Sequence, residues 1–230
     1  MADDRVMLIT GASSGIGAAT ARAAAQEGYR LVLAARSEER LRDLAGELGG
    51  GERAVGQRCD VSVWEDQEAL TRTALDRFGR IDVVFANAGF GGSRGFLAES
   101  PEQWRSMVET NVLGAAYTIR ATLPHLRERG SGHFLLTSSV AGRRVLPGSL
   151  YSVTKWAVTA MGEALRQELA ETDIKVTLIE PGMVDTPFFD ERPSDALADE
   201  DIARTVMFAI SQPARVDVNE ILVRPVHQPG

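Results

Sequence analysis

The chain has 230 residues, of which 44% are hydrophobic and 25% are charged, and its formal net charge at pH 7 is −7. These values are ordinary for a globular protein, and the length allows one hydrophobic core, since cores grow until roughly 250–300 residues. The 25 basic and 32 acidic residues form no block of like charge. This pattern argues against broad binding to nucleic acids or to anionic membranes.

Cysteine and histidine are too sparse to suggest a metal site or an internal disulfide. Cys59 is the only cysteine, and His125, His133 and His227 are far apart in the sequence. The first residues, MADDRVMLITG, lack the basic and apolar regions of a signal peptide, and no apolar run reaches about 18 residues. We therefore expect no metal, no membrane span and a cytoplasmic location.

Short apolar runs alternate with amphipathic stretches along the chain. The runs are rich in β-branched and aliphatic residues, as strands buried on both faces should be; we expect strands at 6–10, 30–35, 53–59, 81–86, 133–138, 175–180 and 220–225. Helical patterns lie between them, at 15–28, 37–50, 63–79, 101–129, 150–172 and 199–211. Such alternation forms parallel βαβ units. It predicts a single α/β domain over 1–230, with a doubly wound parallel sheet covered by helices on both faces.

Residues 10–17, TGASSGIG, lie between the first expected strand and the first expected helix. Most isolated glycine-rich turns are ordinary loops, but one in this place can bring backbone N–H groups close to a pyrophosphate at the helix N-terminus. The spacing is G-x3-G-x-G instead of the commoner G-x-G-x2-G. The candidate cofactor-binding residues of this turn are Gly11, Ser13, Ser14, Gly15, Ile16 and Gly17.

The second expected strand ends with Ala35 and Arg36, where an enzyme that prefers NAD usually carries an acidic residue. An arginine suits the 2′-phosphate of NADP because its planar fork donates charge-assisted hydrogen bonds. Ser13 or Arg40 could help to hold that phosphate. The alternative is that Arg36 is simply a solvated arginine at the start of a helix.

Two further turns follow strand ends on the same expected edge of the sheet. Asp60, which Val61 follows, could accept a hydrogen bond from the adenine amino group, although a helix N-cap role is equally available to it. The NAG turn of Asn87, Ala88 and Gly89 is small and flexible enough to pass beneath a cofactor. We include all five residues among the candidates for cofactor binding.

Tyr151 and Lys155 are four residues apart, so on a helix they share one face. A tyrosine titrates near pH 10 in water, which is too high for acid–base work at neutral pH. A nearby ammonium group, together with a positively charged nicotinamide ring, would stabilise the tyrosinate and lower this pKa. A tyrosine and a lysine at this spacing also occur often by chance.

Ser138, Ser139 and Asn111 are further candidates for the chemistry. The serines end an expected strand and could meet a substrate oxygen there. Asparagine is mildly unfavourable inside a helix, so Asn111 needs a reason, and holding a water in a proton relay to the lysine would be one. Turn formation by the serines and local backbone bonding by Asn111 are the ordinary alternatives.

The order of these motifs resembles that of the short-chain dehydrogenase/reductase family, over nearly the whole chain: TGASSGIG, NAG, Asn111, SSVAG, YSVTK and PGMVDTP. The resemblance implies a Rossmann fold with a seven-stranded sheet, a homodimer or homotetramer, and hydride transfer between NAD(P) and an alcohol or carbonyl. One departure is that Ser139 lies 12 residues before Tyr151, whereas 13 is commoner in the family. Ser138 therefore stays a minor alternative to Ser139.

The resemblance also implies a role for each matching position. Tyr151 is the general acid/base and contacts the cofactor, and Lys155 lowers its pKa and binds the nicotinamide ribose. Ser139 orients the substrate oxygen, and Asn111 supports a water relay. The segment that holds the carboxamide of the cofactor comprises Pro181, Gly182, Val184 and Thr186.

The C-terminal part resembles NADP-dependent reductases that act on 3-hydroxy acids, among them serine and allo-threonine dehydrogenases. Segments 90–100, 143–150 and 188–195 are expected to line the substrate pocket, and a mobile lid is expected around 186–200. Arg94, Arg143 or Arg144 could bind a substrate carboxylate, with Arg143 and Arg144 closest in sequence to the catalytic groups. Each is individually also a candidate for a solvated surface arginine.

The leading interpretation is an NADP(H)-dependent oxidoreductase of small hydroxy or carbonyl compounds, such as a 3-hydroxy acid or a secondary alcohol. A non-catalytic NADP(H) sensor on the same fold is the alternative, although a sensor could lose the tyrosine or lysine that this chain keeps. A serine hydrolase is a third class, but the sequence has no GxSxG motif, and His133 lies in the same strand as the serines.

Overall fold

The computed structural model describes residues 4–188 and 194–228. Its seven strands form one sheet in which every neighbouring pair is parallel, in the order β3-β2-β1-β4-β5-β6-β7. The bounds are β1 Val6–Thr10, β2 Arg30–Ala35, β3 Ala54–Arg58, β4 Val83–Ala86, β5 Ser131–Thr137, β6 Asp173–Pro181 and β7 Glu220–Val223. The predicted doubly wound parallel sheet is confirmed.

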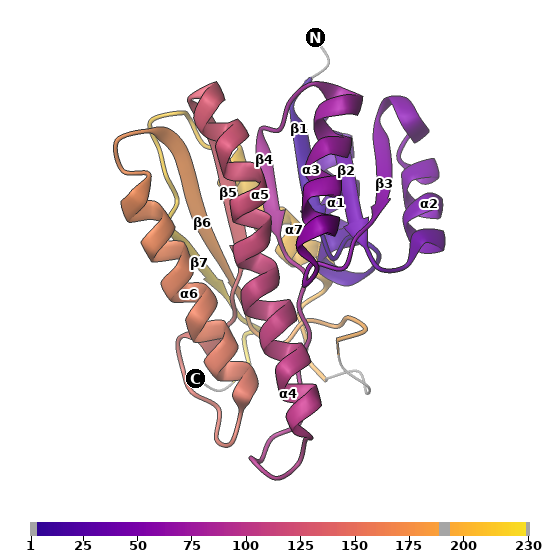
Figure 1. Cartoon of the computed structure of the whole chain (residues 1–230). Helices are drawn as coiled ribbons and strands as arrows, with labels where there is room; N and C mark the ends of the chain where they lie inside the picture. Colours follow the sequence, from indigo (N-terminus) through magenta and orange to yellow (C-terminus); the bar gives the residue numbers. More distant parts are fainter. Residues whose placement is uncertain (1–3, 189–193, 229–230) are drawn as a thin grey trace.

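Helices cover both faces of this sheet (Figure 1). One face carries α1, α2 and α7, and the other carries α3, α5 and α6, with α4 continuing the line of α5. The bounds are α1 Gly15–Gln26, α2 Glu38–Glu47, α3 Trp64–Phe78, α4 Pro101–Val108, α5 Gly114–Arg129, α6 Leu150–Glu168 and α7 Asp199–Ile210. The part of the chain described contains no helix with the length and apolar character needed to cross a membrane.

The side chains of alternate residues in the central strands pack into two separate hydrophobic cores. Met7 and Ile9 of β1 pack under α1 and α7, whereas Val6 and Leu8 pack on the opposite face. All four side chains have 0% exposure. The central strands are therefore apolar at every position because each successive side chain meets a different layer of helices.

The predicted single helix over 101–129 is wrong in one respect. Glu109–Leu113 forms a π-helical turn between α4 and α5, so one extra residue is inserted into the path of the helix. The helical region starts at Pro101 as expected. Ser100 caps α4 and forms a reciprocal capping box with Gln103, and Pro101 lies in the first turn. The π-helical turn contains Asn111, which is buried.

The connection from β3 to β4 places the topological switch point between β1 and β4. The chain runs outwards from β1 to β2 and β3, then returns to place β4 on the other side of β1. In open α/β sheets, the crevice outside the carboxyl ends of the strands at such a point binds ligands. Thr10 ends β1 and Ala86 ends β4, so the glycine-rich turn and the NAG turn meet there.

His133 in β5 gives the fold an expected sensitivity to acid. The ring is buried, its Nε2 lies 2.7 Å from Thr177 Oγ1, and burial, followed by the charge of Lys175, lowers its pKa to about 3. The unfolded chain takes up a proton near pH 6.5 and the folded chain does not, so stability falls as the pH drops from about 6.5 towards 3. Between pH 7 and pH 5 we expect a loss of about 2 kcal/mol from this group.

Urea unfolding of His133→Gln at both pH values tests this expectation. The variant should lose less stability between pH 7 and pH 5 than the parent, by about 2 kcal/mol. His227→Gln is the matched control because His227 is exposed near the end of the described chain. An equal pH dependence in the parent and in His133→Gln would contradict the assignment.

Candidate active site

The turn between β1 and α1 is shaped by glycines that have little room for side chains. Gly11 and Gly15 have φ angles of +67° and +50°, in the left-handed region that favours glycine. A Cβ built on Gly17 would lie 2.3 Å from the carbonyl oxygen of Gly11. Ser14 precedes α1 without capping it by its side chain, and no acidic residue lies in the first turn. The turn therefore offers a backbone cradle at a helix N-terminus, which fits a pyrophosphate.

Hydrogen bonds of Thr10 and Asn87 connect the ends of β1 and β4 at the switch point. The hydroxyl of Thr10 accepts hydrogen bonds from the backbone N–H groups of Asn87 and Ala88, at 3.0 and 3.2 Å. The Asn87 amide donates to Thr10 O and accepts from the hydroxyl of Thr137 at the end of β5. A Cβ on Gly11 would lie 2.9 Å from Ala88 Cα, so the two turns are in close contact.

Three charged candidates lie beside this crevice. Arg36 is exposed immediately after β2, and Arg40 is exposed in the first turn of α2. Arg36 is near enough to Asp60 to favour the charged carboxylate. Asp60 does not cap α3, whose N-cap is Val63; it accepts from the backbone and hydroxyl of Ser62 instead.

Two other candidates from the same region are placed differently. The Val61 side chain is buried in the core against α5, where it occupies the space that a Cβ on Gly114 would need. Only its backbone is therefore suited to contact a cofactor. Ser13 is partly exposed in the glycine-rich turn, and Ile16 packs partly against the core from the start of α1.

Tyr151 and Ser139 meet at the carboxyl end of β5. Ser139 follows the strand, and its hydroxyl is near enough to the phenol of Tyr151 to favour the phenolate. The same oxygen accepts from Ala141 N at 3.1 Å and lies 3.3 Å from Pro181 O. Ser138 lies elsewhere: its buried hydroxyl bonds to Lys155 O and Thr159 Oγ1 in α6. The surroundings thus distinguish the two serines, since Ser139 acts on the pKa of the tyrosine whereas the Ser138 hydroxyl is engaged by α6.

Lys155 lies one helical turn after Tyr151 and is buried. Its Nζ donates to Thr137 O at 2.7 Å and lies 5.6 Å from the centroid of the Tyr151 ring. Burial lowers the pKa of Lys155 to about 8. The group is therefore mainly charged at neutral pH, and it is held on the same side of α6 as the tyrosine.

The pKa of Tyr151 is shifted against the direction that the lysine alone would suggest. Burial raises it to about 12, and the nearby Ser139 hydroxyl opposes that rise only in part. Desolvation disfavours the phenolate more than these neighbours favour it. Use of the phenolate as a base therefore requires additional positive charge at the site.

Asn111 bridges the loop after β4 to α6. Its Oδ1 accepts from Phe90 N at 3.0 Å, and its Nδ2 donates to Phe90 O at 2.9 Å and to Thr154 Oγ1 at 3.1 Å. A Cβ on Gly89 would lie 3.1 Å from Asn111 Oδ1 and 3.6 Å from Lys155 Nζ. Asn111 therefore adjoins the lysine across Gly89.

The segment after β6 folds back over the glycine-rich turn. Gly182 N donates to Val223 O at 2.7 Å, and Met183 N donates to Gln228 Oε1 at 2.9 Å. Val184 is buried, and a Cβ on Gly15 would lie 3.0 Å from the side chain of Thr186. Pro181 and Thr186 thus lie against the serine loop and the glycine-rich turn. Of the expected lid, residues 189–193 lie outside those that the structure describes.

The three arginines proposed for substrate binding have different surroundings. Arg143 Nε donates to the buried Glu180 at 2.7 Å, and the guanidinium also forms an ion pair with Glu220. This pairing argues against Arg143 as the ligand of a substrate carboxylate, because its charge already balances two acidic groups. Arg144 and Arg94 are exposed. Arg144 is adjacent in sequence to the loop that carries Ser139 and remains the better placed of the two.

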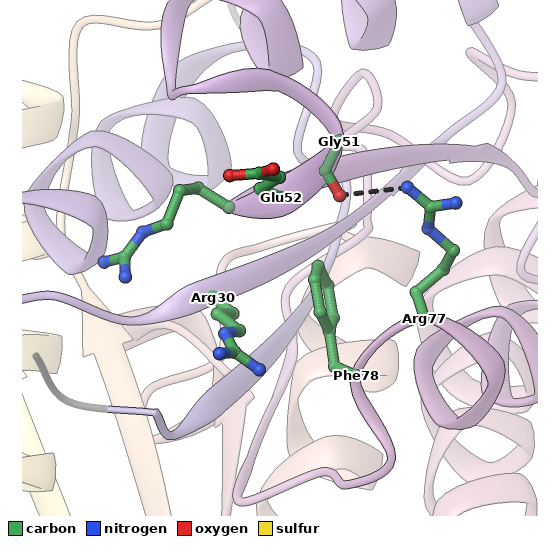
Figure 2. A pocket seen from close by; sticks show the side chains of 6 residues that line it. Arg30, Gly51, Glu52, Arg77 and Phe78 are labelled. Atoms are coloured by element: carbon green, nitrogen blue, oxygen red, sulfur yellow. Dashed lines mark hydrogen bonds between the residues drawn. The ribbon is translucent and has the colours of Figure 1, made fainter.

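A cavity of about 420 Å³ lies at the opposite, amino-terminal end of β2 and β3 (Figure 2). Arg30 and Arg77 lie on either side of Phe78, and each guanidinium is already bound, to Asp4 and to Gly51 O respectively. None of the candidate catalytic, cofactor-binding or substrate-binding residues lines this cavity. We therefore place the candidate site at the carboxyl end of the sheet.

The sequence profile described as short chain dehydrogenase matches residues 5–197 of this chain. The chain belongs to this family. An uncharacterised oxidoreductase of Staphylococcus epidermidis is 39% identical to this short-chain dehydrogenase over 229 residues, covering 97% of this chain and 98% of the relative. The two chains therefore match over essentially their whole lengths.

Two solved structures are similar to this short-chain dehydrogenase over most of their length. The alcohol dehydrogenase of the archaeon Thermococcus sibiricus, complexed with 5-hydroxy-NADP, has a TM-score of 0.91 and 36% identity, and 98% of each chain is covered. The serine dehydrogenase of Escherichia coli has a TM-score of 0.89 and 32% identity, covering 98% of this chain and 100% of the other. The expected relationship to the family that includes serine dehydrogenases is confirmed.

Several residues at the site of this short-chain dehydrogenase were missed by sequence reasoning. Thr10 ends β1 and Thr137 ends β5, on either side of β4, and Thr154 lies between Tyr151 and Lys155 in the sequence. A hydroxyl at a strand end is a weak signal that could have marked the first two. Phe188 begins the segment 188–195 that was expected to line the pocket, but its contact with the ring of Tyr151, with centroids 5.5 Å apart, was not predicted.

Proposed function

We propose that this protein is an NADP(H)-dependent oxidoreductase that interconverts a small alcohol and the corresponding carbonyl compound. The observation that carries the proposal is the convergence of Tyr151, Ser139 and Lys155 beside a glycine cradle at the topological switch point. A tyrosine supplies a proton donor or acceptor, a serine orients an oxygen, and a lysine supplies positive charge. These are the groups that alcohol oxidation and carbonyl reduction require.

The proposed cofactor contacts follow the shape of the crevice. The turn of Gly11, Gly15 and Gly17 holds the pyrophosphate on backbone N–H groups. The adenosine half lies towards Arg36 and Asp60, and the nicotinamide half lies towards Asn87, Lys155 and the segment that follows β6. Further contacts are proposed for Ser13, Ser14, Ile16, Arg40, Val61, Ala88, Gly89, Tyr151, Pro181, Gly182, Val184 and Thr186.

Bound nicotinamide supplies the hydride acceptor for oxidation and the hydride donor for reduction. During oxidation the Tyr151 phenolate takes the proton of the substrate hydroxyl, and during reduction the phenol returns a proton to the carbonyl oxygen. Ser139 donates a hydrogen bond to that oxygen and fixes its place. Lys155, charged below a pH of about 8, has its Nζ 5.6 Å from the centroid of the Tyr151 ring and stabilises the phenolate. Asn111 supports a water in a proton relay.

The proposed substrates are small secondary alcohols, ketones or 3-hydroxy acids. The similarity to a serine dehydrogenase and to an alcohol dehydrogenase supports both kinds of substrate. For a 3-hydroxy acid, Arg144 is the preferred ligand of the carboxylate because Arg143 is paired with Glu180 and Glu220. The lid over 186–200 is proposed to cover the bound substrate.

We also propose that the chain acts in the cytoplasm as a homodimer or homotetramer. Val153 and Trp156 on α6 are 55% and 44% exposed, and Val108 and Leu113 are 38% and 40% exposed near the junction of α4 and α5. Such apolar side chains on two helices of one face support self-association. Light scattering during size-exclusion chromatography gives the mass of the assembly.

The proposed function is tested by following reduced nicotinamide with NADP and with NAD across 3-hydroxy acids and secondary alcohols, and by the reverse assay with ketones. Turnover that depends on NADP is expected. Tight NADP(H) binding with no turnover of any substrate in either direction would contradict the enzyme and favour the sensor. Failure to bind either nucleotide would contradict both.

Replacing Arg36 with leucine tests the preference for NADP. The loss of charge-assisted hydrogen bonds to the 2′-phosphate should raise the KM for NADP by about 10- to 100-fold, while the KM for NAD stays within about twofold. Arg42→Leu is the control because Arg42 is an exposed arginine of α2 that pairs only weakly with Glu38, at 3.8 Å. Equal changes for both nucleotides would exclude a role for Arg36 in recognising the phosphate.

A further inference from the structure

Phe188 covers one side of the tyrosine at the candidate site. Its ring meets that of Tyr151 edge to face, with a centroid distance of 5.5 Å and an interplanar angle of 63°. The contact joins the segment after β6 to α6, so it closes over the residues that would carry out the proton transfer. Phe188 is itself 40% exposed, and Tyr151 is partly exposed, so the ring covers the tyrosine on that one side.

Gly91 provides the recess in which the Phe188 ring lies. A Cβ built on Gly91 would be 2.6 Å from Cζ and 2.7 Å from Cε1 of Phe188. Real Cβ atoms essentially never approach so closely, so alanine at this position would force the ring to move. The loop after β4 and the segment after β6 thus fit each other directly beside Tyr151.

The segment that carries Phe188 is anchored where it leaves the sheet. Val184 is buried and forms a parallel bridge with Leu197. Asp185 N donates to Leu197 O at 2.8 Å, and Leu197 N donates to Met183 O at 2.9 Å. Phe188 lies four residues beyond Val184, so its backbone starts from a fixed point and the ring has a defined position against Tyr151.

We propose that Phe188, seated on Gly91, sets the upper size limit for the substrate substituent that lies beside Tyr151. This inference rests on the proposed function. The substrates it names are alcohols and ketones in which one substituent of the reacting carbon is small, such as methyl. A ring that already contacts the tyrosine leaves no room for a bulky group on that side. The apolar ring also excludes water from the phenol.

The first test measures kcat/KM for a series of ketones and secondary alcohols in which one substituent grows from methyl to phenyl. Phe188→Ala should raise the ratio of activity on the phenyl compound to activity on the methyl compound by at least about tenfold, since removal of a ring opens space for one. Phe208→Ala is the matched control, because Phe208 is an exposed phenylalanine of α7. An unchanged ratio in Phe188→Ala would overturn the proposal.

A double-mutant cycle tests the fit between the two residues. Gly91→Ala should change the size preference in the parent but have no further effect when Phe188 is already alanine. Equal effects of Gly91→Ala in both backgrounds would show that the recess acts independently of the ring. That result would also overturn the proposed pairing.

A chemical measurement separates this inference from the proposed function. Nitration by tetranitromethane, mapped by mass spectrometry, should modify Tyr151 several-fold faster in Phe188→Ala than in the parent, with the partly exposed Tyr117 as the internal reference. If the parent turns over no substrate, the proposed function fails, and faster nitration still supports the cover over Tyr151. Equal nitration in both proteins means that Phe188 does not shield the tyrosine, and the inference fails.

Discussion

Replacing Tyr151 with phenylalanine is expected to lower kcat/KM by about 10²–10⁴-fold, the range that general acid–base groups contribute. The variant removes only the hydroxyl, which lies near Ser139, and keeps the ring that packs against Phe188. NADP(H) binding, measured by calorimetry, should change by less than about threefold. Removing the one group that can exchange a proton with the substrate oxygen explains this difference between rate and binding.

Tyr117→Phe is the matched control for this experiment. Tyr117 lies on α5, where its ring packs edge to face on Trp64, away from the site. Its loss should leave the rate unchanged. A Tyr151→Phe variant with more than about a tenth of the parental rate would remove the tyrosine from the mechanism and direct attention to Ser139 or Lys155.

Gly17→Ala is expected to weaken NADP(H) binding by at least tenfold and to lower the free energy of unfolding by about 1–3 kcal/mol, the usual cost of overpacking. The added Cβ would lie 2.3 Å from Gly11 O and 3.0 Å from Ala12 Cα. Both neighbours are backbone atoms, so the turn itself must move. Calorimetric titration with NADP and urea unfolding measure the two effects.

Gly46→Ala tests whether the effect belongs to the glycine-rich turn. Gly46 lies inside α2, and a Cβ there meets nothing within 4 Å. Alanine should therefore stabilise this helix by up to about 1 kcal/mol and leave nucleotide binding unchanged. If Gly17→Ala bound NADP(H) as well as Gly46→Ala does, the turn would not be the pyrophosphate cradle.

Much of the fold could be predicted because the strands and helices follow local patterns. The strand 6–10 was predicted with its observed bounds, since four apolar residues and a threonine lead into a glycine-rich turn. The predicted ends of the strands were less accurate. Strand β6 extends over Asp173–Pro181, beyond the expected 175–180, because its pairing with β5 begins at the polar residue Asp173. Tertiary pairing, which no local pattern records, fixes such ends.

The candidate site was predictable where function requires a residue at a fixed spacing. The Tyr151–Lys155 pair lies on one helix, so its separation is a local property of the sequence. The pairing of Arg143 with Glu180 and Glu220 joins three separate segments. The contact of Phe188 with Tyr151 and Gly91 also joins segments that are distant in the sequence. Contacts of that kind depend on the folded chain and could not be obtained from spacing.

The π-helical turn at Glu109–Leu113 makes the position of Asn111 depend on the path of the backbone. One residue corresponds to a rotation of about 100° along an α-helix, so reverting this turn to regular geometry would reorient α4 relative to α5. Asn111 accepts one hydrogen bond from Phe90 N and donates two, to Phe90 O and Thr154 Oγ1, and these offset the weaker geometry of the turn. Asn111 therefore holds the loop at Phe90 in place as well as lying near the candidate site. We expect a substitution of Asn111 to displace the loop before Gly91, and with it the recess that holds the Phe188 ring.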